Sequence, residues 1–388
     1  MAAPPAPDRP ALVSHVRAAH GPGLPEALER LVSPFGGWST IVAPHERVAV
    51  KINLLRGAPP ERAVSTHPET LRAVLRAVRA AGAEPFVADS PGGLNGPAKV
   101  ARAYRIAGIS QMCAEEGVQV VDIEDQPVLV EAPQGRLFRH FRIGRPFLRA
   151  DAIVQVGPLK THQLMRLTGA VKLTYGCIPG LEKAQLHVRA QRRDDFADML
   201  LDLHLALRPR FTVIDGIIAM EGQGPGSGRP RELGSLFAAR DALALDAALA
   251  DRTAHRRRDV YTLAAGERRG LIDLDDAYRL AGDPVETVAD FAPARRDIQE
   301  LLPPSLHRLG RRLITARPRL VDGEACIECG ECAGICGVTA IALEPLPEFD
   351  DGRCVRCYAC TEVCPTGAID VVEPWLARRV FGGRDGAS

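Results

Sequence analysis

The chain has 388 residues, of which 46% are hydrophobic and 25% charged, a composition that excludes a disordered or collagen-like chain and favours two or three domains. Its formal net charge of +1 argues against a nucleic-acid or membrane-surface binder. No window approaches the roughly 18 consecutive apolar residues that a membrane-spanning helix needs. The first residues lack the basic and apolar parts of a secretory signal, so we expect a cytoplasmic protein.

The segment from about residue 40 to 250 alternates strand-like and helix-like stretches. Each predicted strand is short, rich in β-branched residues and bounded by turn formers. This alternation predicts an α/β domain with a mainly parallel sheet and flanking helices, a class whose sites gather at the carboxyl ends of strands. The predicted strands are 47–53, 84–89, 118–123, 151–156 and 211–218, and the predicted helices are 68–82, 98–117 and 194–207.

Polar residues fall at or near those predicted strand ends. Lys51 and Asn53 are two apart on one strand, so their side chains face the same way. Asp89 leaves the next strand in a glycine-rich loop that matches no phosphate-binding motif, and none of these residues is diagnostic alone. A single histidine or aspartate of this kind is more often structural. The candidate catalytic set is Lys51, Asn53, Asp89, Lys160, His162, Lys172 and His187.

Lysine is scarce in this chain, which contains 44 arginines and only five lysines. Arginine dominates the positions where either cation would serve, so each lysine is a candidate for a site that needs a compact ammonium or an adjustable pKa. Three of the five lysines are in the candidate set.

Eight of the ten cysteines lie in one 39-residue stretch and form two C-x2-C-x2-C-x3-C repeats. Zinc sites use paired ligands in a different rhythm, and disulfides fit poorly with the expected compartment. The repeated spacing is instead typical of two 4Fe–4S clusters, in which the fourth cysteine of each motif completes the other cluster. We assign one cluster to Cys326, Cys329, Cys332 and Cys364, and the second to Cys354, Cys357, Cys360 and Cys336.

The cysteine-rich stretch is also acidic. Residues 321–372 carry a net charge of −8, whereas residues 305–320 hold five arginines and no acid. The opposite charges suggest two units that dock on each other, although a solvated arginine-rich helix is an equal alternative.

Residues 321–372 resemble the bacterial two-cluster ferredoxin, with one departure, since Gly337 stands where that pattern usually has proline. The resemblance implies a small α+β fold of two β-hairpins and two short helices that transfers single electrons. The phrases VAVKINLL, VGPLKTHQLMRLTGAVKLTYGCIPG and VIDGIIAMEGQGPGSGRPRELG resemble the family catalogued as domain of unknown function 362, whose members often carry such a segment. In that family Lys-Asn is usual where Lys172-Leu173 stands here.

These patterns divide the chain into five parts. We expect an N-terminal extension at 1–40, the α/β domain at 41–300, an arginine-rich connector at 301–320, the ferredoxin-type domain at 321–372 and a tail at 373–388.

The leading hypothesis for function is an oxidoreductase. The ferredoxin-type domain would receive low-potential electrons from a donor protein and pass them to a small anionic substrate in the α/β domain, with His162 or His187 supplying a proton. One alternative is an electron-transfer or assembly subunit without a substrate. A second is a non-redox enzyme with structural clusters. No flavin or nicotinamide signature is visible, and nothing indicates the oligomeric state.

Overall fold

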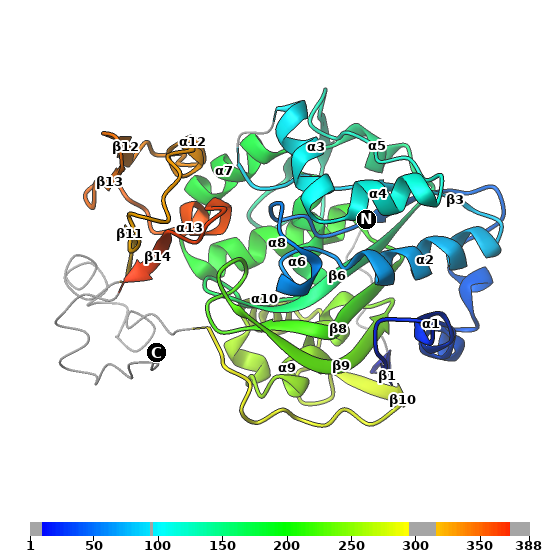
Figure 1. The fold of residues 1–388 in the computed structure, drawn as a ribbon. Coiled ribbons are helices and arrows are strands. Elements are labelled where there is room, and N and C mark those ends of the chain that lie inside the picture. The colour runs from blue at the N-terminus through cyan, green and yellow to red at the C-terminus, as the bar shows by residue number, and fades with distance from the viewer. Residues whose placement is uncertain (1–9, 94–95, 295–315, 373–388) are drawn as a thin grey trace.

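Eight strands form the central sheet of the protein in this computed structural model, which describes residues 10–93, 96–294 and 316–372 (Figure 1). The strand order is β10-β1-β9-β8-β6-β2-β3, and β7 pairs with the end of β6. β2, β3, β6 and β8 run parallel, whereas β9 is antiparallel to both β8 and β1. The strands are β1 (Ala11–Arg17), β2 (Arg47–Lys51), β3 (Glu84–Ala88), β6 (Ala152–His162), β7 (Arg166–Thr168), β8 (Phe211–Glu221), β9 (Arg229–Ala239) and β10 (Tyr278–Gly282).

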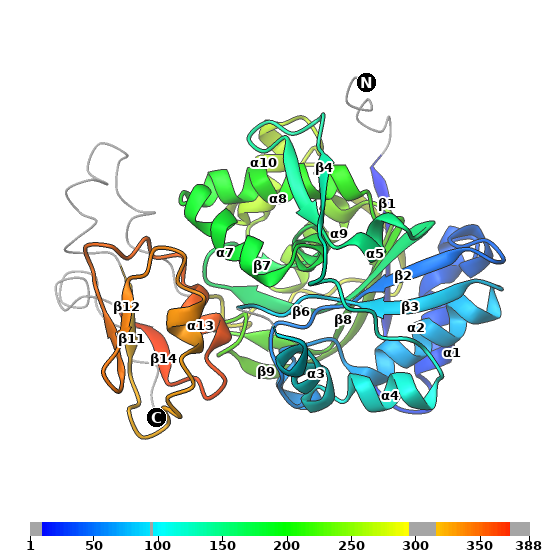
Figure 2. The same ribbon diagram turned by 90° about the horizontal axis from the view of Figure 1, so that it is seen from above.

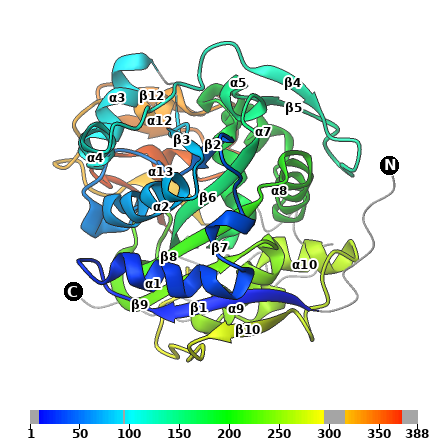
Figure 3. The same cartoon turned by 90° about the vertical axis from the view of Figure 1, so that its right-hand side faces the viewer.

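Helices cover both faces of this sheet. Figures 2 and 3 show α1 to α4 on one side and α8 to α10 on the other, with a separate two-stranded hairpin of β4 (Val128–Glu131) and β5 (His140–Ile143). The helices are α1 (Leu24–Val32), α2 (Pro68–Ala80), α3 (Pro97–Ile106), α4 (Ile109–Glu115), α5 (Arg145–Leu148), α6 (Ala170–Leu173), α7 (Gly180–Arg189), α8 (Arg193–Leu207), α9 (Ala242–Arg252) and α10 (Tyr261–Arg268).

The alternation of side chains along each strand divides the buried residues between two hydrophobic cores. On β2, Val48 and Val50 pack into the core beneath α1 and α2, whereas Ala49 faces the core beneath α8 and α9. When helices cover both faces of a parallel sheet, both sets of alternating side chains are buried, and the strand sequences are nearly continuous apolar runs. The predicted α/β class with a mainly parallel sheet is therefore confirmed.

Two predicted elements differ in detail. The stretch 118–123 forms only an isolated bridge to β3 through Val120, because Asp122 accepts a hydrogen bond from the backbone of Glu124 and turns the chain. The helix expected over 98–117 is divided into α3 and α4 at Gly108, whose φ of +71° is left-handed.

The predicted N-terminal extension is not separate from the sheet. β1 lies between β9 and β10, and α1 packs its apolar side against the core shared with α2. The segment therefore completes the α/β domain, because apolar strand residues such as Val13 and Val16 are fully buried there. Most of the predicted connector and the whole tail lie outside the described residues.

The cysteine-rich segment folds as a small α+β unit, here called the module (residues 316–372). Two antiparallel strand pairs and two short helices make it, as the resemblance implied. One pair, β11 with β14, joins the two ends of the module, and the other is the β12–β13 hairpin. The elements are β11 (Arg317–Leu320), α12 (Glu331–Gly334), β12 (Ile341–Leu343), β13 (Pro347–Phe349), α13 (Ala359–Val363) and β14 (Ile369–Val372).

The module docks beside α7 of the α/β domain (Figure 1). This contact explains the glycine that departs from the ferredoxin pattern. A Cβ added at Gly337 would lie 2.7 Å from Cγ2 of Val188 and 3.2 Å from the carbonyl oxygen of Ala184, both on α7. A proline ring would meet the same atoms, so the close approach of the module to α7 requires glycine.

We predict that Gly337→Ala destabilises the protein by about 1–3 kcal/mol, because overpacking forces neighbouring atoms apart. Urea unfolding of the protein with its clusters, followed by circular dichroism, measures the change. The matched control is Gly323→Ala in the same module, where the nearest atom to an added Cβ is 3.8 Å away. Equal effects of the two substitutions would contradict this account of the contact.

Candidate functional site

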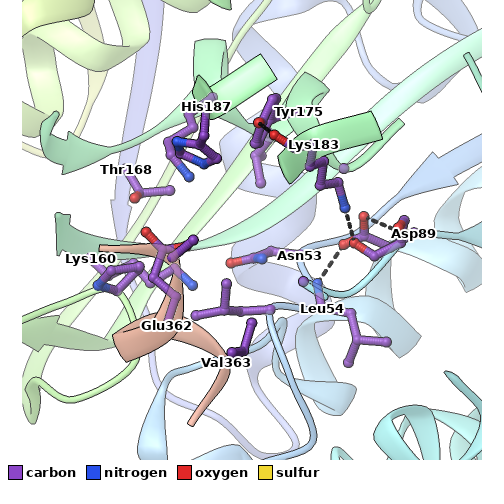
Figure 4. A pocket seen from close by; sticks show the side chains of 18 of the residues that line it. Asn53, Leu54, Asp89, Lys160, Thr168, Tyr175, Lys183, His187, Glu362 and Val363 are labelled. Atoms are coloured by element: carbon purple, nitrogen blue, oxygen red, sulfur yellow. Dashed lines mark hydrogen bonds between the residues drawn. The ribbon is translucent and has the colours of Figure 1, made fainter. Parts of the chain in front are cut away.

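A cavity lies where β2, β3 and β6 end and where the module docks. Lys51 is the last residue of β2, Asp89 follows β3 directly, and Lys160 lies near the end of β6. Because these strands are parallel, their carboxyl ends meet at one edge of the sheet, and the three side chains line one cavity. Figure 4 shows Asp89 and Lys160 at this cavity. We call this space, of about 70 Å³, the lysine cavity.

A buried ion pair forms one wall of the lysine cavity. Lys51 Nζ lies 3.0 Å from Oδ1 of Asp89, and both side chains are at most 2% exposed. The Asp89 carboxylate also accepts hydrogen bonds from the backbone N–H groups of Leu54 and Ser90. Burial raises the pKa of the Asp89 carboxyl, and the charges of Lys51 and Lys183 oppose that shift.

Gly176 is required by this ion pair. A Cβ at Gly176 would clash with Oδ1 of Asp89 and with Nζ of Lys51. Its carbonyl accepts a hydrogen bond of 3.1 Å from the backbone of Ser90. The chain after α6 therefore passes against the charged pair as bare backbone.

Three further lysines line the same cavity. Lys160 donates from Nζ to the carbonyl of Val64 at 2.7 Å, and burial, together with the nearby Lys172, lowers its pKa to about 7. Lys183 donates to the carbonyls of Ser90 and Pro91, and burial lowers its pKa to about 8. Burial also lowers the pKa of Lys172, whose Nζ lies 5.7 Å from the centre of the Tyr175 ring.

Four of the five lysines thus line one cavity. The sequence analysis named Lys51, Lys160 and Lys172 and missed Lys183, which lies in the middle of α7 and follows no strand. The scarcity of lysine in the chain was the signal that could have placed Lys183 in the candidate set. The fifth, Lys99, forms an ion pair with Glu331 of the module.

The module supplies another wall of the lysine cavity, through Ala359, Glu362 and Val363 of α13 together with Ile335. The Glu362 side chain is 13% exposed. Burial raises its carboxyl pKa, against the opposing charges of Lys172, Lys160 and Lys183. The sequence analysis did not name Glu362, because its position depends on how the module docks.

The two histidines of the candidate set have different positions. His162 is absent from the cavity lining: its Nδ1 accepts hydrogen bonds from the backbone of Leu164 and Met165, and its Nε2 lies 3.3 Å from Oε1 of Glu362. His187 does line the cavity, and it stacks on Phe196 with ring centres 4.5 Å apart. Burial lowers the pKa of His187 to about 3, so its imidazole is neutral at physiological pH.

Polar atoms without partners also line the lysine cavity. Within the described part of the chain, Oδ1 of Asn53, Oγ1 of Thr168 and Nδ1 of His187 are buried and have no hydrogen-bond partner. Buried polar atoms normally have one. These three atoms and the partly exposed Lys172 are therefore available to bind a ligand.

The eight clustered cysteines line two further cavities in the module. The first is lined by Cys326, Cys329, Cys332 and Cys364. The second is lined by Cys336, Cys354, Cys357 and Cys360. These are the two sets that the spacing predicts. In each set, the fourth cysteine of one motif joins the first three cysteines of the other motif.

The donor sets suit 4Fe–4S clusters. Each cavity offers four thiols, and a cubane cluster binds each thiolate at a different iron. Among the described residues, no three His, Cys, Asp or Glu side chains converge closely enough to hold a single metal ion. The backbone N–H of Ala340 points at Sγ of Cys336 at 3.1 Å, a contact that favours a thiolate.

The second cysteine cavity adjoins the lysine cavity. Three residues line both of them: His187 of α7, and Ile335 and Ala359 of the module. The first cysteine set is also held against the α/β domain, since the guanidinium of Arg56 donates to the carbonyls of Cys364 and Pro365 and to that of Gly226. A group in the second cysteine cavity would therefore be a direct neighbour of a ligand in the lysine cavity.

The two isolated cysteines lie elsewhere and are buried. Burial raises the pKa of both Cys113 and Cys177 to about 12, so they carry inert thiols and act as small apolar fillers.

Two different family models match the α/β domain and the module. Residues 48–251 match the family described as Domain of unknown function (DUF362), and residues 347–370 match the 4Fe-4S binding domain. A thylakoid-associated protein of Synechocystis sp. is 35% identical over 257 residues, which cover 63% of this chain and 74% of that protein.

Two other similarities are partial. The NADH-quinone oxidoreductase subunit I of Pelobacter propionicus is 30% identical over 101 residues, 22% of this chain and 46% of that subunit. The lactate racemase apoprotein from Thermoanaerobacterium thermosaccharolyticum is similar in structure at 12% identity, with a TM-score of 0.39 over 60% of this chain and 54% of that one. That likeness is too remote to inform the fold or the function.

No helix within the described ranges is long and apolar enough to cross a membrane. The 4Fe-4S binding domain and its cysteines make the protein an iron–sulfur protein of the electron-transfer kind. Since the family match spans more than half of its residues, the chain belongs to the DUF362 family.

Proposed function

We propose that this protein is an oxidoreductase that binds two 4Fe–4S clusters and reduces a small anionic substrate in the lysine cavity. The observation that carries the proposal is the shared boundary between the second cysteine cavity and the lysine cavity. When bound, the clusters supply electrons one at a time at low potential. The cysteine sets given above would hold them.

The charge of the lysine cavity favours an anion. Four ammonium groups line it against two carboxylates, those of Asp89 and Glu362. An excess of positive charge is costly in a site screened from water, and a ligand with one or two negative charges relieves it. The cavity volume of about 70 Å³ is room for a few water molecules and hence suits a small organic acid or oxyanion.

The protons for the reduction come from lysine. At neutral pH His187 is uncharged, whereas Lys160 and Lys183 have pKa values of about 7 and 8 and can give up a proton. Reduction of an activated double bond takes two electrons and two protons. In our proposal Lys160 and Lys183 donate the protons while the module gives up the electrons. Lys172 holds the anionic group together with the unpartnered hydroxyl of Thr168, which can donate a hydrogen bond.

Burial of the lysines favours this enzyme over the alternative of a carrier without a substrate. Lys51 and Lys160 are each 1% exposed, so they cannot contact a protein partner directly. The cavity is also lined by apolar side chains, among them Leu54, Leu55 and Leu173, and by polar atoms without partners. Both features are typical of small-molecule sites.

We predict that anion affinity rises as the pH falls from 9 to 6. A lysine with a lowered pKa is neutral above that pKa and charged below it, so Lys160 and Lys183 gain charge through about pH 7 and 8. Isothermal titration calorimetry with sulfate, which stays a dianion over this range, should show at least about tenfold tighter binding at pH 6. Lys160→Met should remove the part of the rise centred near pH 7. An affinity that does not change with pH would contradict the charge assignment.

We also predict that small unsaturated carboxylates, with fumarate as the first probe, oxidise the dithionite-reduced protein. Stopped-flow absorbance of the clusters under anaerobic conditions measures the rate. Lys172→Met should slow it by at least about tenfold, because the lost contact between the ammonium group and the anion is worth about 1.4 kcal/mol or more.

The matched control for that experiment is Arg102→Met, which removes one positive charge from the exposed face of α3. It should leave the rate unchanged. If no small anion oxidises the reduced protein and sulfate does not bind, the carrier alternative replaces this proposal.

A further inference from the structure

The two cysteine cavities differ in their access to the surface. Cys329 of the first set is the one exposed residue among the eight clustered cysteines, all of which lie in the described residues. The second cavity is partly closed by Ala184, His187 and Val188 of α7. The first cavity also borders the α/β domain, where Arg56 donates to the carbonyl of Cys364 and Lys99 pairs with Glu331. Its Cys329 side is the part that another protein can approach, and the second cavity is the side that faces the lysine cavity.

Two large, exposed apolar side chains line the same cavity as Cys329. Ile327 is 58% exposed and Leu343 is 43% exposed, and both line the first cysteine cavity. Leu343 ends β12, in the hairpin that lies at the outer side of the module, away from the central sheet (Figures 1 and 2). Adjacent exposed apolar side chains are a mark of interaction surfaces.

Acidic side chains accompany this apolar patch. Residues 321–352 contain no lysine or arginine. The exposed acids of this stretch are Asp322, Glu324, Glu328, Glu344, Glu348 and Asp350. Glu328 itself lines the first cysteine cavity, and Glu344 follows Leu343. An apolar centre with charges of one sign near it favours a partner with the opposite charge.

We infer that the surface formed by Ile327, Leu343 and Glu328, together with the adjoining Glu344, docks a one-electron carrier protein whose redox centre is surrounded by lysine or arginine. This inference rests on the proposed cluster loading but not on any substrate of the lysine cavity. Each docking event transfers one electron, so the carrier is oxidised by one electron and the module is reduced by one. The acidic surface holds the carrier over the first cysteine set and steers its approach.

Mitochondrial cytochrome c, a basic one-electron protein, is the probe for this surface, with the acidic plastocyanin as its opposite. Calorimetry at low salt measures binding of cytochrome c to the oxidised protein. Stopped-flow absorbance of the haem measures electron transfer in the reverse direction, from the reduced protein after excess dithionite has been removed, so that one haem iron is reduced for each electron that the module loses.

The test variant is the double charge reversal Glu328→Lys with Glu344→Lys. Its matched control is Glu26→Lys with Glu29→Lys on α1, which makes the same change of net charge at exposed positions far from the module. We expect the test variant to weaken binding and to lower the second-order rate with cytochrome c by at least about tenfold at low salt. The control should change either quantity by less than about threefold.

Salt and the acidic probe complete the test. The rate with cytochrome c should fall as ionic strength rises, and the rate with plastocyanin should rise. Equal effects of the two double variants would overturn the docking surface. So would a failure of cytochrome c to bind at low salt, which would favour a surface covered by the arginine-rich stretch of the chain itself. Oxidation of the reduced protein by fumarate tests the proposed function separately.

Discussion

Four lysine ammonium groups lie in one cavity at the carboxyl ends of the parallel strands, where water cannot hydrate them fully. Burial and mutual repulsion lower the pKa of Lys160 to about 7 and that of Lys183 to about 8. The surroundings are built to tolerate this charge: Asp89 pairs with Lys51, carbonyl oxygens accept from Lys160 and Lys183, and the chain passes Asp89 as the bare backbone of Gly176. In the proposed function, the positive charge that these contacts do not compensate binds the anionic substrate.

The module completes this arrangement by acting as a wall of the cavity. Glu362 adds a second carboxylate opposite the lysines, and the approach of Gly337 to α7 places the second cysteine set against His187. The charge balance of the lysine cavity and the position of the second cysteine set therefore both depend on the interface between the module and α7. We therefore expect a change at that interface to alter both the lysine cavity and its distance from the second cysteine set.

Much of the fold and part of the site could be predicted from the sequence. Regular spacing gave the cysteine sets, and the rule that parallel strands end at one edge of the sheet brought together Lys51, Asp89 and Lys160. Lys183 lies on a helix, and Glu362 reaches the cavity only through docking of the module, so no local pattern predicted either of them. The sequence pattern suggested His162 as a proton donor, but it could not show that the turn after β6 donates two backbone hydrogen bonds to Nδ1 of His162. β1 was taken for an extension because its pairing with β9 and β10 joins the start of the chain to residues more than 200 positions away.

Electron paramagnetic resonance of the dithionite-reduced protein, recorded with and without saturating sulfate, tests the central claim most directly. Two 4Fe–4S clusters, one of them beside the lysine cavity, predict two interacting spins per chain. Sulfate should shift the signal of one cluster and leave the other unchanged, and Lys160→Met with Lys172→Met should abolish that shift. A single spin per chain, or two signals that bound sulfate does not alter, would contradict the account.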